Sequence, residues 1–213
     1  MKNYILYNNL SGNGKCQENA EKISSSLSGE SFIISVSEVD YKKLSESVTK
    51  DDSIVICGGD GTLNCFVNDI EGCSFDCNIL YYPTGSGNDF LKDIEKTPEE
   101  CPFKINQYID NLPSVVVKGK TYRFLNNVGF GIDGYCCEVG DELKKKSTKA
   151  VNYTSVAIKG LLFHYDPTDA TVIVDGKEYS YKKVWIAPTM HGHYYGGGMI
   201  PTPEQDRSSD KLS

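Results

Sequence analysis

The stretch Ile54–Asn64, IVICGGDGTLN, decides the fold. An apolar run typical of a buried strand ends in Gly58-Gly59, and an apolar helical pattern begins at Leu63. Backbone N–H groups in such a turn can point at phosphate oxygens, and the helix N-terminus adds favourable partial charge. Because a carboxylate cannot bind phosphate directly, Asp60 is expected to engage a metal, a hydroxyl or a proton in transfer. The alternative is a plain strand–helix turn in which Thr62 caps the helix.

Short apolar runs alternate with helical patterns on both sides of this stretch. This alternation predicts a mainly parallel sheet covered by helices, a three-layer α/β nucleotide-binding domain over residues 1–120. The expected strands are Asn3–Tyr7, Phe32–Val36, Ser53–Cys57 and Asn78–Tyr82, and the expected helices are Lys15–Leu27, Tyr41–Val48 and Leu63–Ile70.

Three of the expected strands run into glycine-rich loops. These loops are Asn8–Lys15 (NNLSGNGK), Gly58–Asn64 (GGDGTLN) and Pro83–Phe90 (PTGSGNDF). Glycine allows positive φ and a close approach of backbone to ligand. Since ligands of parallel sheets lie at the carboxyl ends of the strands, the three loops predict a single phosphate-binding rim.

The pattern changes after about residue 110, where strands separated by short turns such as Asp175-Gly176 predict a second, β-rich domain over residues 121–213. A helical insert from Gly134 to Phe163 carries a lysine cluster that could meet anionic lipid head groups or form a solvated helix face. The expected strands are Ser114–Lys118, Thr121–Val128, Ala170–Val174 and Lys182–Ala187, and the lysines are Lys144, Lys145, Lys146 and Lys149.

Composition excludes several classes of protein. A net charge of −7 argues against bulk nucleic-acid binding, which needs a basic surface. No apolar run approaches the ~20 residues that cross a bilayer, and the N-terminus does not read as a signal peptide. The eight cysteines contain no CxxC pair, which argues against a zinc ribbon or a thioredoxin-like site. We therefore expect a cytoplasmic protein with reduced thiols.

Three further motifs are weaker. Ser11–Lys15 departs from a Walker A loop at Asn9 and Cys16, so Lys15 is either a cation near phosphates or a solvated lysine. Gly129–Gly134 (GFGIDG) has no acidic residue ~20 positions on, and a bend that presents Asp133 explains it better than a dinucleotide site. Two histidines, at 191 and 193, are too few for zinc and are expected in a flexible loop.

Taken together, the motifs resemble the diacylglycerol kinase catalytic-domain family of lipid kinases. Gly58–Asn64 is followed about twenty residues later by Pro83–Phe90, which is similar to the family's P-x-G-[ST]-x-N-D-F. Asn8–Gly12 is similar to N-P-x-S-G, with Asn9 in place of proline. Asn126–Gly134 and Tyr194–Pro201 are similar to the N-x-x-G-x-G-x-D and Y-x-G-G-G-x-x-x-x-P segments.

The resemblance implies an α/β nucleotide-binding domain followed by a β-sandwich, ATP as phosphoryl donor, Mg²⁺, and a diacylglycerol-like lipid hydroxyl as acceptor. Asp60 and Asp89 are the implied catalytic residues. A structural Mg²⁺ would bind the Asp210 side chain and the carbonyls of Arg207 and Leu212, although Lys211 replaces the usual glycine. The implied nucleotide contacts are Asn8, Ser11, Gly12, Gly58, Gly59, Asp60, Gly61, Thr62, Leu63, Asn64, Gly85, Ser86 and Asn88.

Family members run to about three hundred residues, consistent with two ordinary domains. The resemblance therefore implies an incomplete sandwich, a general base beyond Ser213 and a chain that is inactive alone. It also implies peripheral attachment to the membrane surface, where the lipid lies, and a homodimer is left open. Two alternatives are a kinase of NAD, which also uses GGDGT but usually lacks Asp89-Phe90, and a nucleotide-binding fragment without catalytic activity.

Overall fold

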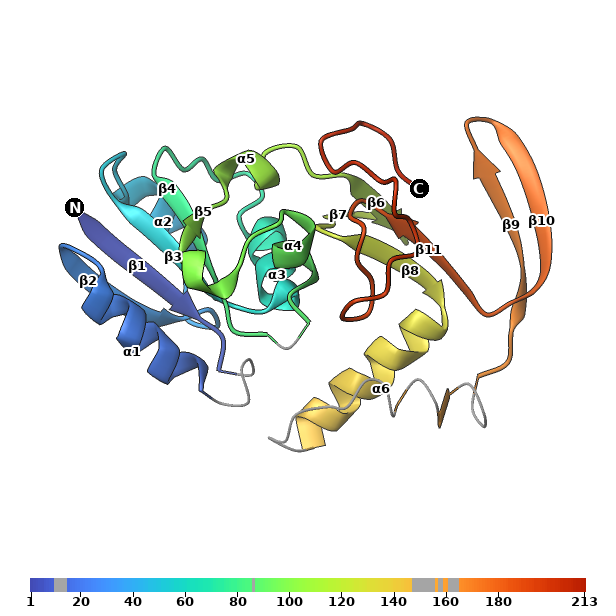
Figure 1. Ribbon diagram of the computed structural model, residues 1–213, viewed down its shortest axis with the longest axis horizontal. Coiled ribbons are helices and arrows are strands. Elements are labelled where there is room, and N and C mark those ends of the chain that lie inside the picture. Colours follow the sequence, from blue (N-terminus) through green and yellow to red (C-terminus); the bar gives the residue numbers. More distant parts are fainter. Residues whose placement is uncertain (10–14, 86, 147–155, 157–158, 161–164) are drawn as a thin grey trace. The chain divides into compact units, whose positions relative to one another are not determined.

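The computed structural model describes residues 1–9, 15–85, 87–146, 156, 159–160 and 165–213 (Figure 1). They form two compact units. Met1–Asn126 and Met190–Ser213 make the first unit, and Asn127–Thr189 makes the second.

The first unit contains a five-stranded sheet in the order β2-β1-β3-β4-β5. The first four strands are parallel and β5 is antiparallel to β4, which confirms the predicted parallel-dominated sheet. The strands are β1 (Lys2–Tyr7), β2 (Glu30–Ser35), β3 (Ser53–Gly58), β4 (Asn78–Pro83) and β5 (Phe103–Lys104).

Helices cover both faces of this sheet. Every residue of β3 is buried, and its side chains alternate between two apolar clusters. Val55 and Cys57 pack against α1 (Cys16–Ser26) on one face. Ile54 and Ile56 face the cluster that includes residues of α2 (Tyr41–Ser47) and α3 (Asp60–Asp69) on the other. Because successive side chains of a strand point to opposite faces, β3 contributes to two apolar cores. The sheet and the helices on its two faces form the predicted three layers.

Short elements complete the first unit: α4 (Asp89–Asp93), the 3₁₀ helix η2 (Pro98–Glu100), α5 (Asn106–Ile109), β6 (Ser114–Val117) and β7 (Lys120–Arg123). The turn between β6 and β7 places Lys118 and Gly119 at positive φ, the requirement of a tight hairpin turn. Asn68 of α3 holds this hairpin through two hydrogen bonds, one from its Nδ2 to the Arg123 carbonyl (2.9 Å) and one to its Oδ1 from the Arg123 N–H (2.8 Å).

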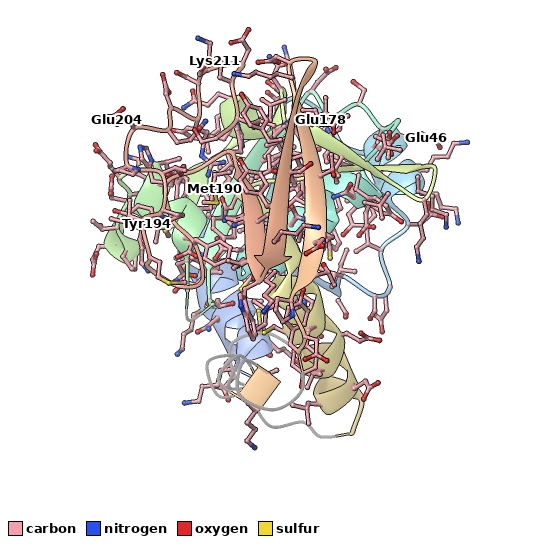
Figure 2. All side chains as sticks on the ribbon, turned by 90° about the vertical axis from the view of Figure 1, so that its right-hand side faces the viewer. Glu46, Glu178, Met190, Tyr194, Glu204 and Lys211 are labelled. Atoms are coloured by element: carbon pink, nitrogen blue, oxygen red, sulfur yellow. The ribbon has the colours of Figure 1, made fainter. Side chains whose placement is uncertain are left out.

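The C-terminal segment belongs to the first unit. The N–H groups of His191 and Gly192 donate to the Asn126 carbonyl (2.8 and 3.0 Å), and Met190 and Ser213 exchange two backbone hydrogen bonds. Figure 2 labels Met190, Tyr194, Glu204 and Lys211 along this segment. This division differs from the predicted boundary at residue 120, because hydrogen bonds to Asn126 return the chain to the α/β unit after the strands of the second.

The second unit contains β8 (Asn127–Gly131), α6 (Ile132–Lys146), β9 (Thr168–Val174), β10 (Lys177–Val184) and most of β11 (Ile186–Met190). β8 pairs with β11, and β9 with β10 as an antiparallel hairpin. Asp175 and Gly176 are both at positive φ in its turn, as a two-residue hairpin turn requires. The described part of the second unit therefore carries strands, as predicted.

Two predicted strands in this region are corrected. Thr121–Val128 is not one strand, because buried Phe124 and Leu125 separate β7, which pairs with β6, from β8, which pairs with β11. Lys182–Ala187 divides at Trp185 into the ends of β10 and β11. The predicted helical insert begins as α6, whereas residues 147–155, 157–158 and 161–164, which include Lys149, lie outside the described residues. No helix within the described ranges is long and apolar enough to cross a membrane.

Candidate active site

The loops that follow β1, β3 and β4 meet at the carboxyl edge of the sheet. Asn8, after β1, donates from Nδ2 to the Thr62 hydroxyl at 2.9 Å. The backbones of Gly59 and Gly85 touch, so a Cβ on Gly85 would lie 2.8 Å from the Gly59 Cα. Neither glycine has positive φ, which was one predicted reason for glycine here. Close approach of two backbones is what requires glycine at these positions.

Thr62 does not cap α3. The helix begins at Asp60 with Gly59 as its N-cap, and no side chain caps it. The Thr62 side chain instead packs over Gly58, where a Cβ would come within 2.5 Å of the Thr62 Cβ, and its hydroxyl accepts the bond from Asn8. The plain-turn alternative with a Thr62 cap therefore does not describe this loop.

Asp60 ties the β3 loop to the β4 loop. Its Oδ2 accepts the Asp89 N–H and its Oδ1 accepts the Phe90 N–H, both at 3.0 Å. These are first-turn amides of α4, whose own N-cap, Asn88, is left-handed at φ 49° and provides no side-chain cap. Asp60 thus caps a helix almost thirty residues further along the chain. No local pattern in the sequence indicates this contact.

Asp89 is buried, with 8% of its surface exposed. Its Oδ2 accepts the Gly197 N–H at 2.9 Å, while its Oδ1 has no hydrogen-bond partner in the described part of the chain and lies 3.6 Å from the Lys92 Nζ. The Oδ1 of neighbouring Asn88 is also buried without a hydrogen bond among the described residues. Buried polar atoms are normally bonded, so two such oxygens side by side in sequence mark a place for a ligand.

The other predicted nucleotide contacts differ in what they offer. Gly61 is exposed, and nothing lies within 4 Å of the position that a Cβ would take there. Leu63 is fully buried in the core, so only its backbone faces the loop side. The Asn64 Oδ1 accepts the Leu125 N–H at 2.9 Å, which commits that side chain to the fold. Ser11, Gly12 and Ser86 lie outside the described residues, and exposed Lys15 precedes α1.

The residues predicted for a structural Mg²⁺ lie in the C-terminal segment. The Arg207 carbonyl oxygen lies 3.1 Å from the His191 Nε2, and Asp210 and Leu212 are exposed. Within the described ranges, no group of three or more His, Cys, Asp or Glu side chains could hold a metal. A site made mainly of carbonyls is not of that kind, so the Mg²⁺ site stays a prediction.

Asp93, the last residue of α4, is the centre of a buried ion cluster. Its side chain is 1% exposed, Oδ1 accepts both the backbone N–H (2.7 Å) and the Nδ1 (2.5 Å) of His193, and Oδ2 accepts the Arg207 Nε. Burial raises the pKa of Asp93, but Arg207 and His193 outweigh it and hold that pKa below its usual value.

Arg207 and His191 complete this cluster. The guanidinium donates to the Leu125 carbonyl (2.6 Å) and to the Asn126 Oδ1 (2.8 Å) and stacks over Phe90. His191 places Nδ1 2.8 Å from the Leu125 carbonyl, and burial lowers its pKa. The two histidines are therefore parts of an ordered cluster and not of a flexible loop. A cavity of about 760 Å³ lies beside the cluster, with Tyr108 and Asn111 also in its wall.

A parallel sheet with touching glycine loops and a partly unsatisfied aspartate at its carboxyl edge defines an α/β protein of the class that binds its ligand at the carboxyl ends of the strands. The sequence profile described as "Diacylglycerol kinase catalytic domain" matches residues 2–121. The chain belongs to this family of kinases.

Individual relatives agree with this assignment. The chain is 24% identical to a proposed lipid kinase of Staphylococcus carnosus (strain TM300), covering 98% of this chain and 71% of that one. It is 29% identical to a proposed lipid kinase of Staphylococcus haemolyticus (strain JCSC1435), covering 76% of this chain and 52% of that one. It thus spans about half the length of the latter relative.

The fold is similar to solved structures of the same family. A proposed diacylglycerol kinase from Bacillus anthracis str. Sterne superposes with a TM-score of 0.62 at 19% identity, over 99% of this chain and 73% of that one. A second diacylglycerol kinase structure from that organism gives a TM-score of 0.55 at 19% identity. At this identity the likeness shows the fold alone.

Proposed function

We propose that the protein transfers the γ-phosphate of ATP to the hydroxyl of a diacylglycerol-like lipid. The observation that carries the proposal is the state of Asp89, a buried carboxylate with one oxygen lacking a hydrogen bond in the described chain. It is held next to the rim where Asn8 contacts Thr62 and the β3 and β4 loops touch through Gly59 and Gly85. Phosphoryl transfer asks mainly for positioning and for neutralisation of charge, and this rim offers both.

The triphosphate would bind to the loop backbone. Contact between Gly59 and Gly85 leaves no room for side chains between the β3 and β4 loops, and in this proposal the backbone amides of the two loops face the phosphate oxygens. The N-terminus of α3, a ten-residue helix, adds favourable partial charge for an anion. Asp60 fixes the spacing of the two loops through its bonds to α4.

Mg²⁺ suits the two oxygens at the start of α4. Asn88 Oδ1 and Asp89 Oδ1 are hard oxygen donors, buried and without hydrogen bonds among the described residues, which is the donor type that magnesium prefers. When bound, Mg²⁺ would offset the negative charge of the phosphates. A second ion at the Asp210 side chain and the Arg207 and Leu212 carbonyls remains part of the proposal.

The lipid acceptor is supported by the family and by the names of the relatives. A lipid substrate would place the protein at the cytoplasmic surface of a membrane, attached peripherally. The acceptor hydroxyl must lose its proton during transfer, and a carboxylate is the usual acceptor in such reactions.

Calorimetry with MgATP and transfer of labelled γ-phosphate to diacylglycerol in detergent micelles test this proposal, with NAD as the competing acceptor. We expect MgATP binding and incorporation into diacylglycerol, both weakened by Asp89→Asn, whereas the family resemblance by itself implies a chain that is inactive alone. Glu46→Gln, which neutralises an exposed carboxylate on α2, is the matched control (Figure 2). Absence of MgATP binding by the folded protein contradicts the proposal, and labelling of NAD favours the soluble-substrate alternative. Binding without transfer to either acceptor favours a nucleotide-binding protein without catalytic activity.

A further inference from the structure

Two buried cysteines meet directly beneath the rim. Cys16, the first residue of α1, and Cys57, the next-to-last residue of β3, are both 0% exposed, and their sulfur atoms lie 3.5 Å apart. The Cys16 thiol also donates to the Cys57 carbonyl oxygen at 3.0 Å, and its Sγ lies 3.5 Å from the Thr84 hydroxyl. Cys57 precedes Gly58 and Thr84 precedes Gly85, so this pair touches the start of two rim loops.

We propose that Cys16 and Cys57 are an oxidation site, a thiol pair that a hydroperoxide converts into an intramolecular disulfide beneath the rim. The effect of this disulfide on nucleotide binding rests on the function proposed above, whereas its formation does not. None of the eight cysteines, all of which lie in described parts of the chain, is in a disulfide in this structure.

The surroundings of Cys16 favour a reactive thiolate. It begins an eleven-residue helix, whose N-terminus stabilises negative charge on sulfur. The hydrogen bond with the Cys57 thiol, supported by Thr84 and the backbone at Asn8, outweighs burial and lowers the pKa of Cys16. The same shared proton, together with burial, raises the pKa of Cys57. The two sulfurs thus share a proton at 3.5 Å, close enough for one to attack the other once the first is oxidised.

The reaction balances in two steps. The Cys16 thiolate attacks one peroxide oxygen, the O–O bond breaks, and hydroxide leaves and takes up a proton, so that Cys16 becomes a sulfenic acid. The Cys57 sulfur, after losing its proton, then attacks the Cys16 sulfur and expels hydroxide, which leaves as water. Both sulfurs are oxidised, the peroxide is reduced, and hydrogen peroxide yields two molecules of water in total.

The loops at the rim have little room to accommodate the shorter distance between the two sulfur atoms. A disulfide brings the two sulfurs to about 2.05 Å, so they approach by roughly 1.5 Å. Gly58, adjacent to Cys57, is already packed under Thr62, and Gly59 touches Gly85. Movement at Cys16 also changes its contact with Thr84. We therefore expect the disulfide to displace the loops and to weaken MgATP binding about tenfold.

Peptide mapping by mass spectrometry after incubation with hydrogen peroxide tests the site itself. We expect a cross-linked peptide that joins Cys16 to Cys57, two hydrogens lighter than the reduced pair, and its loss on reduction. Cys57→Ala and Cys16→Ser abolish the cross-link, whereas Cys65→Ala, which removes an exposed thiol of α3, retains it. Circular dichroism confirms that each variant is folded. Serine is used at position 16 because it keeps a polar group of similar size at this buried position.

The outcomes separate this proposal from the proposed function. A native protein in which peroxide oxidises Cys65 while Cys16 and Cys57 remain thiols overturns the oxidation site, and burial of both sulfurs is then the reason. A cross-link with unchanged MgATP affinity overturns the coupling to the rim. A cross-link in a protein that binds no MgATP in either state supports the oxidation site and contradicts the proposed function.

Discussion

Each end of α4 carries an aspartate, and the two aspartates differ in their hydrogen bonds. Asp89 begins the helix and Asp93 ends it, and both side chains are largely buried. Asp93 has both oxygens hydrogen-bonded, by His193 and Arg207, although a carboxylate at a helix C-terminus is unfavourable by itself. Asp89 sits at the favourable end, yet one of its oxygens lacks a hydrogen bond in the described chain. Both oxygens of Asp93 are thus committed to the fold, whereas Asp89 Oδ1 has only the Lys92 Nζ at 3.6 Å.

The largest expected effect comes from Asp93→Asn. Removing the charge leaves the Arg207 guanidinium, whose side chain is only 10% exposed, buried without its carboxylate. Breaking a buried pair from one side costs about 3–5 kcal/mol, so we expect a loss of that order in the free energy of unfolding by urea. An unchanged midpoint and slope would mean that the ion pair of Asp93 with Arg207 contributes nothing net to the stability of the first unit.

The ion pair of Asp93 with Arg207 also makes the stability of the protein depend on pH. The pKa of Asp93 is lower in the folded protein than its usual value of about 4, so its contribution is complete above that pH and is lost as pH falls through the folded pKa. Urea unfolding at pH 6 and pH 3 should show a larger loss for the wild type than for Asp93→Asn. Equal losses would indicate that other carboxylates dominate acid unfolding.

Asp89→Asn tests the other end of α4. We expect phosphoryl transfer to fall by about a hundredfold or more, the scale of losing one main electrostatic contributor, with little change in the melting temperature. The amide oxygen can still accept the Gly197 N–H, which preserves the one strong bond of this side chain. A variant that is destabilised like Asp93→Asn but retains activity would reverse the comparison.

Gly85→Ala tests whether the loops need to touch. Its Cβ would lie 2.8 Å from the Gly59 Cα, and overpacking of this kind costs about 1–3 kcal/mol and should weaken MgATP binding. Gly61→Ala is the matched control, because nothing lies within 4 Å of its Cβ and alanine stabilises a helix by about 0.5–1 kcal/mol. The thermal stability should therefore fall for Gly85→Ala and rise for Gly61→Ala, and parallel changes in stability would exclude backbone contact as the reason.

The smallest effect is expected for Asp60→Asn. The amide can keep one of the two bonds to α4 but not both, so we expect a loss of about 1 kcal/mol in stability, typical of a weakened cap. Transfer should fall further if Asp60 also acts on phosphate or metal, as the family resemblance implies. Comparing kcat with stability for Asp60→Asn and Asp89→Asn shows which of the two aspartates acts chemically.

Local patterns in the sequence predicted the α/β unit well. Apolar periodicity predicts a strand at Ile54–Cys57 and a helix at Leu63–Ile70, and the structure has β3 and α3 there. Contacts between distant residues carry no such signal. The cap that Asp60 provides to α4 and the pairing of Asp93 with Arg207 each join segments whose spacing is set only by the folded chain.

The same limit applies to two glycines and two histidines. The sequence predicts glycine at 59 and 85 partly for positive φ, whereas in the structure each glycine leaves room for the backbone of the other. The sequence also predicts a flexible loop for His191 and His193, because the Leu125 carbonyl and the Asp93 carboxylate that hold them are far away along the chain. Side-chain contacts with residues far along the chain cannot be predicted from local sequence patterns.

The return of Met190–Ser213 to the first unit has a consequence for biosynthesis. A ribosome releases the chain from its N-terminus, so the sheet and α4 emerge first, and the whole second unit is made before Arg207 becomes available. Until then Asp93 has no guanidinium, and the nascent α/β half must persist without one of its strongest bonds. Folding of this half is therefore expected to finish late in translation, as in other discontinuous domains whose closing contacts span a long loop.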